Sequence, residues 1–108
     1  MTAFDTYGTS AYTPRELSDL LASRLAATFI ERESYWIGSY FLATLADTTS
    51  LKIQPNAIPG DDGEDDLYED EHPDMTVLLL VTSPVDAESL NAELAAVEGL
   101  TRLRSSAN

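Results

Sequence analysis

The chain has 108 residues, of which 44% are hydrophobic, and it contains no cysteine. This length suits one domain that buries its own core, and the lack of cysteine excludes disulfides, thiolate metal sites and cysteine nucleophiles. Nineteen acidic residues against six basic ones give a net charge of −13, which disfavours binding to nucleic acid or to acidic membrane surfaces.

The N-terminal residues are small and polar with scattered aromatic side chains, and we expect residues 1–12 to form a loose arm. They lack the basic and apolar regions of a signal peptide. The longest uninterrupted apolar run, Val77 to Val81, is far too short to span a membrane. We therefore expect a soluble, cytoplasmic protein.

A first helix is predicted to begin at Thr13. This residue can accept a hydrogen bond from the third helical residue, Pro14 suits the first helical position, and Glu16 can complete a capping box. Leucines then recur at spacings of three and four, which is typical of a helix with one buried face. These leucines are Leu17, Leu20, Leu21 and Leu25.

From Phe29 the hydrophobic period changes to two, which predicts a strand over residues 35–45, preceded by a short strand or the helix tail. Residues 47–50 resemble a turn into a strand that ends at Pro55, because proline cannot donate to the ladder. The apolar run MTVLLLVT, residues 75–82, is hydrophobic on both faces, which indicates a central strand.

A second helix is expected to begin near Pro84 and to end before Gly99, where a left-handed cap belongs. Its buried stripe would be Ala87, Leu90, Leu94 and Val97. Residues 100–104 are expected to form a short last strand, and residues 105–108 a frayed tail.

Together these elements predict a single α+β domain over residues 13–104, in the order α-β-β-β-β-α-β. Two amphipathic helices with one apolar face each most simply cover one face of a mainly antiparallel sheet of four to five strands. The expected fold is therefore a two-layer sandwich with an acidic loop over residues 56–74.

The acidic loop is the feature most informative about function. Nine of the fourteen residues from Asp61 to Asp74 are acidic. Such a loop can be a solvated insertion, or it can steer and bind a basic protein, with Tyr68 as an aromatic anchor inside the charged rim. The predicted contact set is Asp61, Asp62, Glu64, Asp65, Asp66, Tyr68, Glu69, Asp70 and Glu71. Because like charges repel and only Leu67 and Tyr68 could tether the segment, we expect Asp61 to Asp70 to be mobile until a partner binds.

Metal binding or catalysis at this loop has weaker support from the sequence. The acids are nearly consecutive, and the spaced pattern of a calcium loop is absent, so no metal or other cofactor is predicted and a divalent-cation site stays a minor alternative. The single histidine, His72, has no nucleophile or second base at a motif spacing. We predict that the protein is not an enzyme.

A second candidate surface is an aromatic row on the long strand. Alternation places Trp36, Tyr40 and Leu42 on the face opposite Phe41. If helices cover only the Phe41 face, this row is exposed and could support a homodimer or bind a partner.

The residues Phe29, Arg32, Glu33, Ser34, Gly38 and Tyr40 form the pattern F-x-x-R-E-S-x-x-x-G-x-Y, followed by Ile53 and Asn56 in I-x-x-N. With the acidic loop and apolar strand, this pattern resembles small actinobacterial proteins of unknown function and, more loosely, immunity proteins of bacterial polymorphic and contact-dependent toxin systems. The resemblance covers about residues 17–103. It implies a stoichiometric inhibitor of a cognate toxin, often a basic nuclease, and it transfers no individual binding residue.

The sequence therefore leaves three functions open. The first is an acidic protein-binding module, most concretely an immunity protein that neutralises a basic toxin. The second is a DNA mimic that blocks a nucleic-acid-binding effector, which requires carboxylates at phosphate-like spacing over a long surface. The third is an accessory subunit that dimerises through its exposed strand face.

Overall fold

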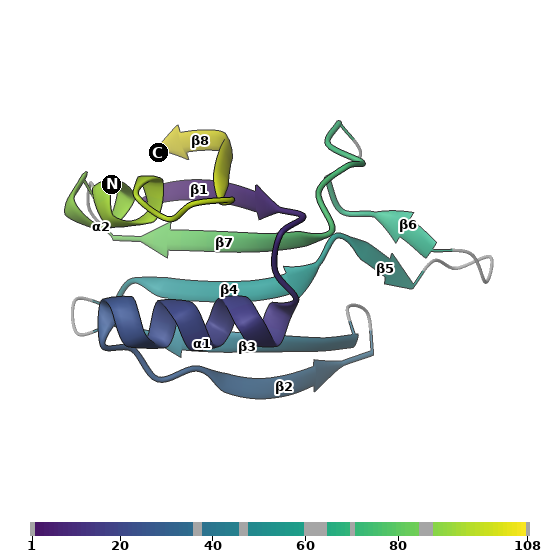
Figure 1. Ribbon diagram of the computed structural model, residues 1–108, viewed down its shortest axis with the longest axis horizontal. Coiled ribbons are helices and arrows are strands. Elements are labelled where there is room, and N and C mark those ends of the chain that lie inside the picture. Colours follow the sequence, from purple (N-terminus) through teal and green to yellow (C-terminus); the bar gives the residue numbers. More distant parts are fainter. Residues whose placement is uncertain are drawn as a thin grey trace.

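The computed structural model describes residues 2–35, 38–45, 48–59, 65–69, 71–84 and 88–107. Six strands form one antiparallel sheet in the order β2-β3-β4-β7-β1-β8 (Figure 1). Their bounds are Ala3–Thr9 (β1), Ile30–Ser34 (β2), Gly38–Thr44 (β3), Ser50–Pro55 (β4), Val77–Ser83 (β7) and Thr101–Ala107 (β8). Strands β5 (Ala57–Pro59) and β6 (Asp65–Leu67) pair with each other in a separate hairpin.

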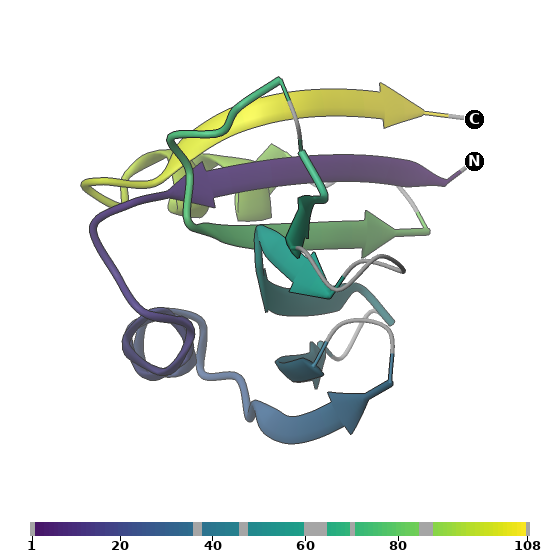
Figure 2. The same ribbon diagram turned by 90° about the vertical axis from the view of Figure 1, so that its right-hand side faces the viewer.

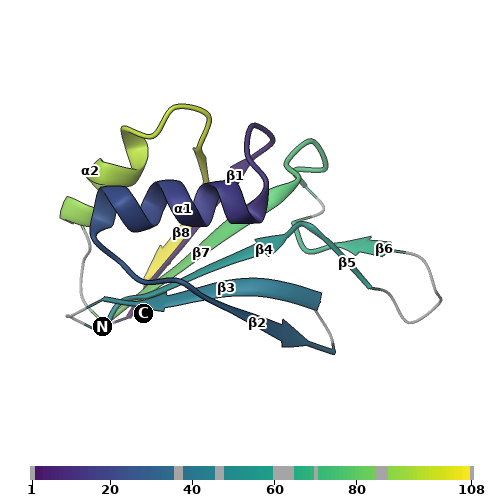
Figure 3. The same cartoon turned by 60° about the horizontal axis from the view of Figure 1, so that its bottom comes forward.

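Two helices, α1 (Pro14–Leu25) and α2 (Glu88–Ala95), lie on the same side of the sheet (Figure 3). Helix α1 begins with the predicted capping box: the Glu16 N–H donates to the Thr13 hydroxyl at 3.1 Å, and the Thr13 N–H donates to the Glu16 carboxylate at 2.9 Å. Gly99 has a φ of 85°, as its predicted left-handed role requires. The α+β class and the placement of both helices on one face are confirmed, although the sheet has six strands rather than four or five.

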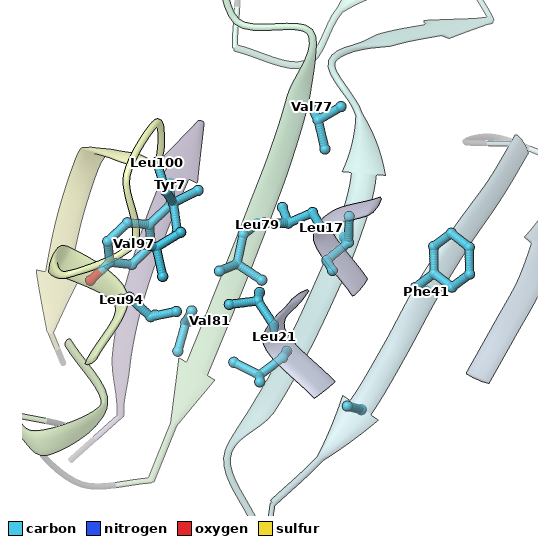
Figure 4. Close-up of a cluster of buried hydrophobic side chains, with 13 residues drawn as sticks. Tyr7, Leu17, Leu21, Phe41, Val77, Leu79, Val81, Leu94, Val97 and Leu100 are labelled. Carbon is cyan, nitrogen blue, oxygen red and sulfur yellow. The ribbon is translucent and has the colours of Figure 1, made fainter. Parts of the chain in front are cut away.

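The core lies between the helices and the sheet. Leu17 and Leu21 of α1 are fully buried over the central strands, and Tyr7 lies with Leu94, Val97 and Leu100 near α2 (Figure 4). From the sheet the core receives Phe41, Ala43, Leu51, Ile53, Val77, Leu79 and Val81. Each fully buried leucine stabilises the fold by about 1.5–3 kcal/mol relative to an exposed one, so this layer carries most of the hydrophobic stabilisation.

The N-terminal segment corrects the prediction of a loose arm, because residues 3–9 form β1, between β7 and β8. The sequence of β1 does not show a clear alternation of apolar and polar residues, because Asp5 faces the core and Gly8 has no side chain. The Asp5 carboxylate is buried and accepts a 2.6 Å hydrogen bond from Arg102. Tyr7 is buried next to it on the same face, and its phenol donates to Asn91 Oδ1 at 2.6 Å. Burial raises the pKa of Tyr7, an effect that Asp5 reinforces and Arg102 opposes.

Three further expectations are corrected. The tail is not frayed over 105–107, because β8 continues to Ala107 along β1. The strand predicted over 35–45 begins only at Gly38, whose φ is 85°, and the segment before it is the strand β2, which pairs with β3. The acidic loop also contains the hairpin of β5 and β6, so the order is β-α-β-β-β-β-β-β-α-β.

Neither α1 nor α2 covers the second face of the sheet. We call it the open face, and it consists of the strand residues that point away from α1 and α2. Met75 and Leu103 pack over one part of it, because a Cβ added at Gly8 would lie 2.9 Å from Met75 Cγ and 2.7 Å from Leu103 Cδ1. Figure 2 views the molecule from the end at which β5 and β6 project.

Candidate functional site

Strands β5 and β6 form a small ladder beyond the end of the main sheet, and we call these two strands the acidic hairpin (Figure 1). Ala57 pairs with Leu67, Ile58 with Asp66 and Pro59 with Asp65. Asp65 and Asp66 of the predicted contact set therefore lie on strand β6, whose backbone is paired with β5.

Asn56 fastens the hairpin to the main sheet. Its backbone N–H donates to the Thr76 carbonyl at 3.0 Å, and its backbone carbonyl accepts from the Tyr68 N–H at 2.8 Å. Its buried side chain accepts from the Glu69 N–H at 2.8 Å. The side-chain amide also donates to the carbonyls of Met75, His72 and Glu69, at 2.8, 3.1 and 3.4 Å respectively. One residue thus organises the segment that follows β6.

Glu69 is an acid of the predicted contact set that the structure places inside the protein. Its residue is only 3% exposed, and its carboxylate accepts a 2.8 Å hydrogen bond from the guanidinium of Arg104 on β8. An uncompensated carboxylate at this depth would be costly, and the charge-assisted bond offsets that cost. In this structure Glu69 therefore ties the segment after β6 to the edge strand.

Leu67 and Tyr68 have the opposite environment, although they directly precede Glu69. Leu67 is 38% exposed and Tyr68 is 48% exposed. The hydrogen bonds to Asn56 fix the backbone at Tyr68 and Glu69, so these apolar side chains are held at the surface by ordered neighbours. A hollow of about 500 Å³ lies next to Tyr68 on the open face. It is lined by Phe4, Asp5, Thr6, Tyr68, Glu69, Leu80, Val81, Thr82 and Arg104.

The rest of the predicted contact set is only partly described. Glu71 is exposed, whereas Asp61, Asp62, Glu64 and Asp70 lie outside the described residues. His72 is half-buried, and its N–H donates to the Glu69 carbonyl at 3.1 Å. Within the described ranges no group of three or more His, Asp or Glu side chains could hold a metal ion.

The second predicted surface lies on the open face. Tyr40 and Leu42 are half-buried there, and the Lys52 ammonium lies 4.8 Å from the centre of the Tyr40 ring. Trp36 lies outside the described residues. Because side chains alternate along β3, Tyr40 and Leu42 point to the open face while Phe41 is buried on the helix side, as predicted.

Asn56 and Arg104 were not predicted from the sequence as residues of this site. Asn56 follows Pro55 in a stretch that reads as loop, and Arg104 immediately precedes the segment expected to fray. The only sequence signal for their connection is weak: a buried acid needs a cation, and Arg104 is one of just six in the chain.

Comparisons with known proteins assign no family. In the part of the chain that the structure describes, no helix is long and apolar enough to cross a membrane. No protein-family model matches the sequence, and no curated protein matches it significantly.

Proposed function

We propose that this chain is a non-enzymatic, acidic protein-binding module, most concretely an inhibitor of the immunity-protein type that neutralises a basic toxin. The observation that carries the proposal is the exposure of Leu67 and Tyr68 on a backbone held by Asn56, within the most acidic segment of the chain. An exposed apolar pair on ordered backbone loses little conformational entropy on binding, and acids around it steer a basic partner.

Individual residues have separate roles in this proposal. Tyr68 provides the aromatic anchor that the partner would bury, with Leu67 beside it. Asp61, Asp62, Glu64, Asp65, Asp66, Asp70 and Glu71 provide the charged rim that attracts lysine and arginine of the partner. Glu69 acts indirectly, because its carboxylate is occupied by Arg104 and its contribution is to hold the backbone of Tyr68 in place.

The charge of the open face does not favour DNA mimicry. A mimic needs carboxylates along an extended surface. The strand residues on the open face of the six-stranded sheet include no aspartate or glutamate, so this face has no stripe of carboxylates across its strands.

The experiment is a comparative pull-down from the source organism followed by kinetics. Baits are the wild type, Tyr68→Ala, a rim variant (Asp61, Asp62, Asp65 and Asp66 to Lys) and a control variant (Asp19, Glu33, Glu88 and Glu98 to Lys). The two lysine variants change the net charge equally, but the control changes exposed acids outside the hairpin. A protein retained by wild type and control and lost by the other two is the partner.

With the purified partner, the rim variant should associate more slowly, and its association rate should depend less on salt. Expressed alone, the partner should inhibit growth, and co-expression of the wild type should relieve that inhibition. Equal affinity and equal salt dependence of wild type and rim variant would show that the acidic hairpin is not the interface.

A further inference from the structure

The basic residues of this acidic chain are unevenly distributed over the sheet. Glu31 pairs with Phe41 on the helix side and contacts Arg15 of α1 at 3.2 Å, so the neighbouring Arg32 points to the open face. Lys52 pairs with Leu42 and with Leu80, also on the open face. Arg104 pairs with Thr6 there. Half of the six basic residues therefore lie on a face whose strands carry no acid.

Two of these three cations have no acidic partner among the described residues. Arg15, Arg24, Arg102 and Arg104 each lie within 4.0 Å of a carboxylate. Among the residues that the structure describes, Arg32 and Lys52 have no such neighbour, and Lys52 lies over the Tyr40 ring instead. In a chain with 19 acids, two such cations on a face whose strands carry no acid, and whose only described ion pair is that of Arg104 with Glu69, indicate a surface complementary to negative charge.

The same face exposes large apolar side chains. Ile30 is 54% exposed and Phe4 is 41% exposed, at opposite sides of the sheet. Between them Leu42 and Leu80 are half-buried, on either side of Lys52 in one row across the strands. A face with exposed apolar residues and cations among them has the composition of a binding surface rather than of a solvated one.

We propose that the open face binds the acidic hairpin of a second copy of this chain. The hairpin has the complementary chemistry, since Asp65 and Asp66 lie on β6 and the exposed Leu67 and Tyr68 follow. In each copy the hairpin projects from the end of the central strands β4 and β7 (Figure 1). A two-fold arrangement can therefore place each hairpin against the open face of the other copy, which makes the interface self-complementary.

The net charge of −13 on each copy does not prevent this contact. At physiological ionic strength the screening length is about 8 Å, so most acids of one copy act weakly on those of the other. Charges that meet across the interface are separated by less than this length. The local complementarity of Arg32 and Lys52 with the hairpin therefore decides the sign of the interaction.

The test is analytical ultracentrifugation of the full chain over a range of concentrations, for four proteins. These are the wild type, Arg32→Glu/Lys52→Glu, the control Arg15→Glu/Arg24→Glu, and Asp65→Lys/Asp66→Lys. The first two double variants change the net charge equally, but only one of them alters the open face. We expect the wild type to dimerise, the open-face variant to raise the dimer dissociation constant about tenfold or more, and the control to stay close to wild type.

A mixing experiment identifies the occupant of the face. The open-face variant and Asp65→Lys/Asp66→Lys should each dimerise poorly alone, and they should form a mixed dimer when combined, because both contacts are then complementary again. This restoration also shows that both variants are folded. The proposal would be overturned if the wild type stayed monomeric from about 1 μM to about 200 μM. It would also be overturned if the open-face and control variants weakened the dimer equally, or if no mixed dimer formed. Binding of a DNA oligonucleotide that the open-face variant alone loses would assign the face to nucleic acid and would likewise overturn it.

Discussion

Replacement of Asn56 by alanine should destabilise the protein far more than a single side-chain truncation normally does. The substitution removes all four side-chain hydrogen bonds and leaves the Glu69 N–H, which is in a buried residue, without its acceptor. The two shorter bonds from the amide contribute about 1 kcal/mol each, and an unsatisfied buried N–H costs about 1–3 kcal/mol. The expected loss is about 3–5 kcal/mol, against a total stability of about 5–15 kcal/mol for a domain of this size.

Urea unfolding measures this loss. With a denaturant slope of roughly 2 kcal/mol per molar, the midpoint should fall by about 1.5–2.5 M. Asn91→Ala is the matched control, because it makes the same chemical change but removes the 2.6 Å hydrogen bond from Tyr7, for which about 1 kcal/mol is expected. If the two variants unfold within about 0.5 kcal/mol of each other, Asn56 does not organise the hairpin as the structure indicates.

Amide hydrogen exchange gives a second, local measurement of the same feature. The N–H groups of Tyr68 and Glu69 both donate to Asn56, so they should exchange slowly in the free wild-type protein. In Asn56→Ala both should exchange faster. This expectation differs from the mobility that the sequence predicts for Asp61 to Asp70, of which residues 61–64 and 70 lie outside the described residues. Fast exchange at Tyr68 and Glu69 in the wild type would favour the sequence-based prediction.

Three further substitutions test the sheet. Tyr7→Phe should cost about 0.5–1.5 kcal/mol near neutral pH through the lost bond to Asn91. Because burial raises the pKa of Tyr7 above 10.0, the wild type should lose this advantage as the pH rises beyond about 10, and unfolding curves of both proteins at pH 7 to 11 measure it. Gly8→Ala should lower the melting temperature, since the new Cβ would lie 2.7 Å from Leu103 Cδ1; an overpacked site of this kind costs about 1–3 kcal/mol. Gln54→Met should stabilise the fold or leave it unchanged, because the buried Gln54 amide has no hydrogen-bond partner among the described residues; a loss above about 1 kcal/mol by urea unfolding would reveal a partner for that amide.

Local sequence signals were sufficient to predict the parts of the fold that depend on residues close together in the chain. The capping box at Thr13, the apolar run of β7 and the left-handed Gly99 each depend on chemistry within a few residues. They are found as predicted, because propensity, capping and burial favour the same conformation there.

Strand β1 could not be predicted in this way. Its membership in the sheet depends on β7 and on β8, which lies about a hundred residues away along the chain. Asp5 is buried only because Arg102 reaches it, and Gly8 is required only because Leu103 and Met75 pack closely over it. A polar residue and a glycine read as loop until these partners are known.

The acidic segment shows the same limit at the candidate site. In the sequence Glu69 is one of nine similar acids, yet it is buried against Arg104 while Glu71, two residues later, is exposed. Composition predicts the charge of the segment correctly, but only tertiary contacts separate an acid that supports the site from acids that can meet a partner.

The two proposed contacts use the same structural unit. Leu67 at the end of the hairpin and Tyr68 directly after it are exposed, and they cannot be buried against a basic partner and against a second copy at once. A basic partner must therefore displace the second copy, and its apparent affinity should fall as the concentration of this chain rises above the dimer dissociation constant. The open-face substitutions remove this competition without changing the hairpin, so Arg32→Glu/Lys52→Glu should bind the partner at least as tightly as the wild type does. Weaker binding of the partner by this variant would mean that the open face contacts the partner itself.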